Sequence, residues 1–329
     1  MIEKNQWHPV ALCHAVIDAP LPVRLLGQEL VLWRDAQGQV QAFADRCPHR
    51  GARLSLGRVL GGQLECPYHG WQFASGGQCV KVPAVPRFTP PPQHCVPSFG
   101  VQEAYGLVWV QLAQPEAGQA EVPLPVFAAE ADARLRKLHC GPYDVAASAP
   151  RIIENFLDMS HFGFVHEGWL GSRDSTEMAR YEVQATPRGV KATGCKAVQP
   201  LSNLHSTQPA EVDYTYEVTA PYTALLTKVP EAGSSKQGWH EAIGLFVSPL
   251  TPETSRVWFR LAVADFDSTD AQLQQFQHTI FTQDRPVLES QSPKRLPLDP
   301  RAELNSAADR MSVAYRRYLQ GSGITFGVC

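Results

Sequence analysis

Hydrophobic residues in the first third of the chain alternate with polar ones in short runs. Residues 30–33 (Leu-Val-Leu-Trp) and 40–43 (Val-Gln-Ala-Phe) are two such runs, and the turn-forming residues 35–38 (Asp-Ala-Gln-Gly) separate them. Short alternating runs with Asp and Gly at the tip are typical of a β-hairpin. Similar runs follow at 79–82 and 107–112. We therefore expect a small all-β domain over residues 1–125.

The pattern changes after residues 113–125, a linker-like stretch rich in Ala, Pro, Gln and Glu. Ser148 and Pro150 are typical of a helix N-cap and first turn, and apolar residues then recur at helical spacing from Ile152 to His161. Strands are predicted in the middle of this part, where short runs are bounded by Pro, Gly or polar turns, at 180–185, 212–219, 241–248 and 256–264.

Two helices are predicted near the C-terminus. The first begins at a Ser268 or Thr269 cap and breaks at Pro286, and the second begins at a Ser306 cap and ends at Gly321. Helices that flank one antiparallel sheet make the class α+β. We therefore expect two domains, an all-β domain over residues 1–125 and an α+β domain over residues 126–329.

Composition and charge exclude several classes of function. The chain has 329 residues and a formal net charge of −3, with no basic block that would bind nucleic acid. Residues 1–15 include charged side chains and form no signal peptide, and no apolar run is long enough to span a membrane. Six of the eight cysteines have no partner spacing, which indicates free thiols in a reducing compartment, the cytoplasm.

Two mixed Cys/His loops are the most informative feature. Cys47 and His49 are two residues apart, and Cys66 and His69 follow sixteen intervening residues later. This pattern places both thiolates on one iron and both imidazoles on the other iron of a [2Fe–2S] cluster. A structural zinc site is the alternative, because two Cys and two His can also bind zinc tetrahedrally. Zinc fingers, however, usually pair Cys with Cys and His with His along the chain.

A second pair of histidines follows in the predicted helix. His161 and His166 are five residues apart and would lie about 140° apart around a regular helix. A π-bulge eased by Gly163 would bring both imidazoles to one metal. The alternative is two unrelated histidines.

Asp284 favours the metal site. It shares a helix stripe with apolar residues, and a buried carboxylate is normally paired or bound to a metal. An arginine such as Arg151 is the alternative partner. Two His and one carboxylate form the facial triad of non-haem Fe(II) oxygenases.

With these motifs together, the chain resembles the Rieske non-haem iron oxygenases over nearly its whole length. The resemblance implies that Cys47, His49, Cys66 and His69 bind the cluster. It also implies that His161, His166 and Asp284 bind iron, within a catalytic domain of the helix-grip fold. Asp158 would occupy the family's bridging carboxylate position, and Asn155 a position beside the iron.

The resemblance extends to the branch that acts without a small subunit. That branch includes the vanillate and dicamba O-demethylases, toluenesulfonate methyl-monooxygenase and the methylxanthine N-demethylases. Residues 166–171, 314–318 and 327–329 are similar to the saxitoxin-pathway hydroxylases. It implies a monooxygenase that uses O₂ to hydroxylate or demethylate a small aromatic or heterocyclic molecule. A cis-dihydroxylating arene dioxygenase is the alternative, and an electron carrier fused to a ligand-binding domain is another of a different class.

The resemblance also implies partners. Electrons would come from NAD(P)H through a separate reductase, with or without an intermediate ferredoxin. Members of the family form homotrimers in which the cluster of one subunit serves the iron of the next. We therefore expect a homotrimer in which His69 of one chain lies near Asp158 and His161 of its neighbour. Arg316 and Arg317 are expected only to complement the dipole at a helix C-terminus.

Overall fold

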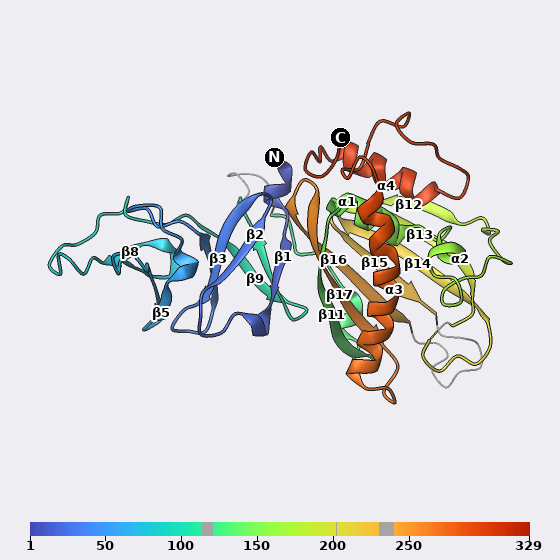
Figure 1. Ribbon diagram of the computed structural model, residues 1–329, viewed down its shortest axis with the longest axis horizontal. Coiled ribbons are helices and arrows are strands. Elements are labelled where there is room, and N and C mark those ends of the chain that lie inside the picture. The colour runs from blue at the N-terminus through green and yellow to red at the C-terminus, as the bar shows by residue number, and fades with distance from the viewer. Residues whose placement is uncertain (114–120, 202, 230–239) are drawn as a thin grey trace. The chain divides into compact units, whose positions relative to one another are not determined.

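The computed structural model describes residues 1–113, 121–201, 203–229 and 240–329. These residues form two compact units, Ile2–Leu124 and Pro125–Cys329, and each is described here by itself (Figure 1). Part of the predicted linker, residues 114–120, lies outside the described residues.

The first unit contains two antiparallel sheets. The larger has the strand order β1-β10-β9-β4-β3-β2 and the smaller the order β5-β6-β7-β8. The predicted hairpin is confirmed, since β3 pairs with β4 and places Val31 opposite Phe43. The strands are β1 (His8–Leu12), β2 (Leu21–Leu25), β3 (Gln28–Arg34), β4 (Val40–Ala44), β5 (Arg58–Leu60), β6 (Gln63–Glu65), β7 (Gln72–Phe73), β8 (Cys79–Lys81), β9 (Ser98–Ala104) and β10 (Leu107–Gln111).

One hydrophobic core joins the two sheets of this unit. Trp33 and Phe43 from the larger sheet pack with Phe73 from the smaller sheet, and Cys47 and Cys66 belong to the same cluster. The two loops that carry these cysteines are therefore anchored in the core at their first residue.

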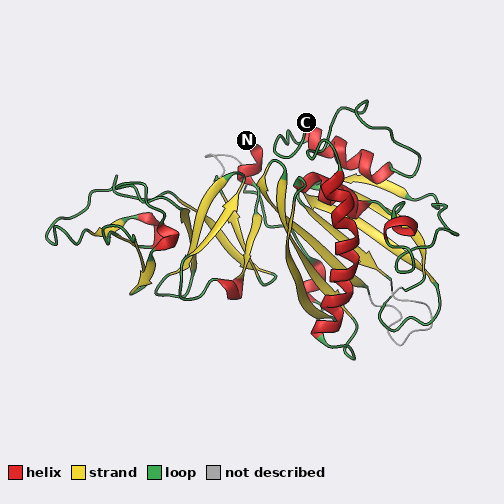
Figure 2. Cartoon of the chain, viewed as in Figure 1, coloured by secondary structure: helices red, strands yellow, loops and turns green. Residues whose placement is uncertain are grey.

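The second unit is built on a seven-stranded antiparallel sheet with the order β11-β17-β16-β15-β14-β13-β12. The α+β class is confirmed, because helices pack on this sheet (Figure 2). The four predicted strands correspond to β12, β14, β16 and β17, whereas β11, β13 and β15 were not predicted. The strands are β11 (Arg136–Val145), β12 (Glu182–Thr186), β13 (Gly189–Gln199), β14 (Ala210–Ala220), β15 (Thr223–Lys228), β16 (Glu241–Thr251) and β17 (Thr254–Val263).

Four α-helices complete this unit, namely α1 (Ala149–Leu157), α2 (Phe162–Val165), α3 (Asp270–Ser290) and α4 (Arg310–Gly321). The long helix α3 runs across the sheet (Figure 1). Its apolar stripe is buried as predicted, since Leu273, Ile280 and Leu288 are all buried. Within the described ranges, no helix combines the length and the hydropathy that a membrane span requires.

Two predicted helix boundaries were wrong. Helix α3 begins at a Thr269 capping box but does not break at Pro286. A proline removes only one backbone hydrogen bond, and the last turn is held by an Arg285–Glu289 ion pair and by Glu289, which accepts a hydrogen bond from the Ala146 backbone. Helix α4 begins at Arg310 rather than beside Ser306, because Ser306 and Asp309 form a turn before it.

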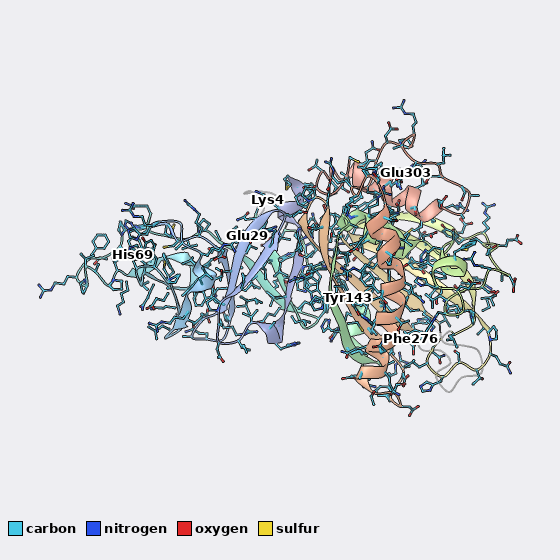
Figure 3. The ribbon with its side chains drawn as sticks, viewed as in Figure 1. Lys4, Glu29, His69, Tyr143, Phe276 and Glu303 are labelled. Atoms are coloured by element: carbon cyan, nitrogen blue, oxygen red, sulfur yellow. The ribbon has the colours of Figure 1, made fainter. Side chains whose placement is uncertain are left out.

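A group of four charged side chains ties α1 to α4 and to the segment before α4. Arg316 donates to both oxygens of Glu154, at 2.5 and 2.8 Å, and to Glu303 at 2.6 Å. Arg151 donates to Glu303 at 2.6 Å. Figure 3 marks Glu303. Arg316 is only 9% exposed, so the prediction that it merely complements the helix dipole was wrong.

Removal of Arg316 should destabilise the second unit strongly. Arg316→Met leaves Glu154 buried without its main partner, and breaking a buried ion pair in this way destabilises by about 3–5 kcal/mol. Urea unfolding of the two proteins measures the difference. Arg301→Met is the matched control, because its ion pair with Asp299 is exposed, and its unfolding midpoint should stay close to that of the wild type. Equal midpoints for all three proteins would contradict this role of Arg316.

Candidate metal centres and active site

The two Cys/His loops of the first unit have the same backbone design. Gly51 and Gly70 occupy equivalent positions with φ of 73° and 67°, a conformation that favours glycine. Each loop is closed by two backbone hydrogen bonds, which are Cys47 N–Ala52 O (2.8 Å), Gly51 N–Cys47 O (2.9 Å), Cys66 N–Trp71 O (2.8 Å) and Gly70 N–Cys66 O (3.1 Å). The structure therefore presents two matched turns, each with one Cys and one His.

The side chains of these loops converge. The rings of His49 and His69 lie 4.5 Å apart, and His49 stacks on Trp71 at 4.5 Å. His49 Nδ1 is buried and makes no hydrogen bond, as expected for a nitrogen that binds a metal. Burial raises the pKa of the Cys47 thiol to about 11, so a thiolate at this position needs a neighbouring cation.

The spacing of the four side chains distinguishes the two metal alternatives. The ligand atoms of a tetrahedral zinc lie within about 4 Å of one another, because zinc–ligand bonds are about 2.0–2.3 Å long. Among the described residues, only His161, His166 and Asp284 bring three potential ligand atoms within 4.8 Å of one another. Cys47, His49, Cys66 and His69 do not form such a group, as expected if they bind the two irons of a cluster and not a single zinc.

In the second unit, Asp158 ends α1 and begins the turn that positions His161. Its carboxylate accepts hydrogen bonds from the backbone of Ser160 at 3.0 Å and of His161 at 3.2 Å. An Asp side chain that bonds nearby backbone N–H groups competes with helix continuation. The helix therefore stops at Leu157.

The predicted π-bulge was wrong. His161 and His166 do not belong to one continuous helix, because the single-turn helix α2 separates them, with His161 before its first residue and His166 after its last. This turn is closed by hydrogen bonds from the Val165 backbone to His161 and from the His166 backbone to Phe162. One short turn thus brings the two imidazoles together, with their ring centroids 5.0 Å apart.

Both imidazoles face Asp284 on α3. Asp284 Oδ1 lies 3.4 Å from Nε2 of His161 and 3.1 Å from Nε2 of His166. Asp284 is 7% exposed and His166 is 1% exposed. The predicted set of two His and one carboxylate is therefore brought together, in the arrangement that binds non-haem iron.

A second layer of side chains orients the histidines through their other ring nitrogens. His161 Nδ1 lies 2.8 Å from Asp158 Oδ2, and His166 Nδ1 lies 2.8 Å from Gln283 Oε1. An Nδ1–H that donates to these oxygens leaves the Nε2 lone pair free for a metal. Asn155 Nδ2 donates to Asp284 Oδ1 at 3.3 Å. Gln283 was missed by sequence analysis, since nothing but its position next to Asp284 distinguishes it.

The hydrogen bonds of Asp158 determine its charge state. Burial raises the pKa of the Asp158 carboxyl, but hydrogen bonds from His161 and Ser160 lower it further, and the net pKa lies below its usual value. Asp158 is therefore ionised at neutral pH, which favours the proton on His161 Nδ1.

A cavity of about 120 Å³ opens beside the two histidines and Asp284. It lies between the sheet and helices α1 and α3, and Figure 3 marks one lining residue, Phe276 of α3. The apolar part of its lining consists of Ile152, Phe156, Phe162, Leu170, Leu226, Ile243, Leu245, Phe259, Phe276, Ile280 and Phe281. The polar part consists of Asn155, Gln199, Tyr214, Tyr216, Lys228 and Gln277. Such a pocket suits a small, mostly apolar molecule.

Comparison with known protein families agrees with both centres. Residues 6–100 match the Rieske [2Fe–2S] domain, and residues 145–322 match the vanillate O-demethylase oxygenase C-terminal domain. The first match contains both Cys/His loops, and the second contains both histidines, Asp284 and the cavity.

Individual relatives agree with these matches. Methylxanthine N1-demethylase NdmA of Pseudomonas putida is 34% identical, over 96% of this chain and 88% of its own. The solved structure of P. putida CBB5 NdmA with caffeine aligns with a TM-score of 0.84 and 31% identity, and covers 96% of this chain and 90% of its own. Oxidoreductase NdmD of P. putida is 45% identical over 35% of this chain, which is 20% of its own length.

The iron content of two variants should distinguish the role of Asp284 from that of Gln283. Asp284→Ala removes a predicted ligand, so we expect the protein to lose one iron per chain while the visible spectrum of the cluster remains. Gln283→Leu removes only the contact that orients His166, and such a change weakens metal binding about 10–100-fold. Iron analysis after dialysis against graded chelator concentrations measures both effects.

Gln275→Leu is the control, because Gln275 lies on the exposed side of the same helix. It should retain iron like the wild type. Full iron content in Asp284→Ala would exclude a ligand role for Asp284.

Proposed function

The chain belongs to the Rieske non-haem iron oxygenases with a catalytic domain of the vanillate O-demethylase type, and on that premise we propose that it N-demethylates a small, uncharged N-methylated heteroarene. It is an O₂-dependent oxidoreductase that uses a [2Fe–2S] cluster, a mononuclear iron and electrons from a separate reductase. Its reaction is hydroxylation or oxidative demethylation. The substrate class and the residue roles below are the proposal.

In this proposal residues 1–125 carry the cluster and residues 126–329 carry the catalytic iron. Cys47, His49, Cys66 and His69 bind the cluster, which the matched loops and the unpartnered His49 Nδ1 support. His161, His166 and Asp284 bind the mononuclear iron.

One observation supports a catalytic role most directly. The His161–His166–Asp284 set lies in the lining of an apolar cavity rather than in a closed core. A structural metal site is normally closed by protein ligands, whereas a catalytic site keeps positions open. An electron carrier fused to a binding domain would have no use for this set. The relative NdmA, which matches this chain over most of its length, is a demethylase and not a cis-dihydroxylating enzyme.

The chain's own residues have distinct roles in this reaction. Asp158 and Gln283 hold the Nδ1 protons of the two histidines, and Asn155 restrains Asp284 through its amide. The aromatic lining excludes water and places the methyl group near the histidines. When bound, the two metal centres supply O₂ activation and the transfer of two electrons. One oxygen atom of O₂ enters a C–H bond of the methyl group. The N–C bond of the resulting hydroxymethyl group then breaks, so that the carbon leaves as formaldehyde and the nitrogen keeps the hydroxyl proton. The other oxygen atom takes up the two electrons and two protons and leaves as water.

The similarity to methylxanthine N1-demethylase supports a heterocyclic substrate. The amide groups of Gln199 and Gln277 are uncharged polar groups that suit a neutral ring. A second candidate rests on Lys228, the one cationic residue in the described lining apart from the histidines. A cation there would favour a methoxylated arene that carries a carboxylate, with O-demethylation as the reaction.

Product analysis tests these two candidates. With a reductase, NADH and O₂, we expect caffeine or theobromine to yield formaldehyde and the demethylated purine in equal amounts. Vanillate should yield neither formaldehyde nor protocatechuate. Formaldehyde from vanillate alone would favour the second candidate, and a cis-diol from an arene would contradict demethylation altogether.

We also propose the assembly and the electron path. The chain forms a homotrimer in the cytoplasm, where an NAD(P)H-dependent reductase, directly or through a ferredoxin, reduces the cluster. The cluster of one subunit then serves the iron of its neighbour, by way of His69 and the neighbour's Asp158 and His161. The family resemblance supports this arrangement, and closed rings satisfy a repeated donor-to-acceptor interface.

Two inactive variants test the electron path. Cys47→Ser removes the cluster and His161→Ala weakens the iron site, so each alone should be inactive. When the two are unfolded together and reassembled with metals, mixed trimers join an intact cluster to an intact iron across an interface, and part of the activity should return. Mixed trimers that form, as judged by native mass spectrometry, but remain inactive would show that electrons pass within one chain.

A further inference from the structure

Gln199 is a fully buried amide without a hydrogen-bonding partner. It is the last residue of β13, it is 0% exposed, and it lines the cavity beside the metal-binding set. Neither its Oε1 nor its Nε2 makes a hydrogen bond. Most buried side-chain amides in proteins are paired, so a fully buried amide without partners requires a physical explanation.

The neighbour of this amide is a tyrosine. Burial raises the pKa of the Tyr214 hydroxyl, and a contact with the Gln199 side chain lowers it. The contact does not reach hydrogen-bond geometry, so it leaves both amide atoms available. Tyr214 is followed along the cavity wall by Tyr216, at 5.9 Å between ring centroids, and Tyr216 by Phe156 of α1 at 5.9 Å. Gln199 thus lies at one end of an aromatic wall.

An unpaired amide at this position lowers the stability of the protein when no ligand is bound in the cavity. A buried polar group without a partner is less favourable than a paired one, because it has lost its hydrogen bonds to water without replacing them. A methionine of the same length would fill the space without that penalty. A contribution to folding therefore does not account for the amide, whereas a ligand that completes its hydrogen bonds would.

We propose that Gln199 determines substrate specificity by pairing with a cis-amide edge of the heteroaromatic substrate, a ring N–H next to a ring carbonyl. The Gln199 Nε2 donates to the carbonyl while Oε1 accepts from the ring N–H, so one side chain completes two hydrogen bonds. The methyl group to be oxidised then lies on another part of the ring, toward His161 and His166. This inference rests on the proposed function and names the part of the substrate that is recognised.

Two probes that differ at this edge test the inference. Theobromine has a free N–H between two ring carbonyls, whereas caffeine carries a methyl group on that nitrogen. In the wild-type holoenzyme, equilibrium dialysis without O₂ should show that theobromine binds about ten- to hundredfold more tightly than caffeine, since one buried partner group is left unpaired with caffeine. Gln199→Met should remove this preference.

The unfolding temperature provides a second test. A structural role for Gln199 predicts that Gln199→Met unfolds at a lower temperature, whereas a role in substrate binding predicts that it does not. Gln199→Met should unfold at the same temperature as the wild type or at a higher one, because it removes an unpaired buried group. Gln111→Met is the matched control. Gln111 is also buried, but it donates to the Asn5 carbonyl at 2.7 Å. It should unfold at a lower temperature while keeping the preference for theobromine.

The outcomes separate this inference from the proposed function. Wild-type enzyme that demethylates a methylxanthine but shows no preference, or a Gln199→Met variant that keeps the preference, would overturn the inference alone. A Gln199→Met variant that unfolds earlier or fails to fold would also overturn it, because the amide would then be structural. Wild-type enzyme that neither binds nor demethylates either probe would overturn the proposed substrate class, and this inference with it.

Discussion

The buried carboxylate of Asp284 is the constraint on which the catalytic unit depends. It lies on the same stripe of α3 as Leu273, Ile280 and Leu288, where a charged group is unfavourable unless a partner balances it. The partners that the chain supplies are two imidazole nitrogens and the Asn155 amide. When neutral, these groups carry no positive charge, so the site as built favours the binding of a cation.

A comparison with another group of ionic side chains in this unit shows how the two groups differ in net charge. Arg151 and Arg316 face Glu154 and Glu303, so that group carries two positive and two negative charges and is neutral by itself. The metal-binding set has two carboxylates, Asp158 and Asp284, and two imidazoles whose Nε2 atoms converge on Asp284. With neutral imidazoles it carries two negative charges, which a divalent cation neutralises. The first group stabilises the positions of α1 and α4, whereas the second has a negative charge that a metal ion would balance.

Sequence analysis predicted those features that arise from local chemistry. The hairpin over residues 28–44, the Ser148 and Thr269 caps and the apolar stripe of α3 all depend on residues close in the chain, and all were found. Strands β13 and β15 were missed, because Gly, Lys and Thr interrupt the first and the second is short. The π-bulge was wrong because the Asp158 side chain accepts hydrogen bonds from the backbone of Ser160 and His161 and so ends the helix before the histidines. Gln283 and Gln199 could not be identified, since their roles depend on how α3 and β13 meet other elements in space.

Unpaired buried atoms do not by themselves mark a binding site. Ser248 Oγ and Trp258 Nε1 are also buried without hydrogen bonds, but neither residue lines the cavity beside the histidines. A ligand in that cavity could therefore not complete their hydrogen bonds. Gln199 differs because its unpaired amide belongs to the wall of a space that a small molecule would fill. The same reasoning applies to Asp284, whose carboxylate also lies in the wall of this cavity. The cavity wall therefore carries both a negative charge that a cation would balance and an amide that a substrate would complete with hydrogen bonds.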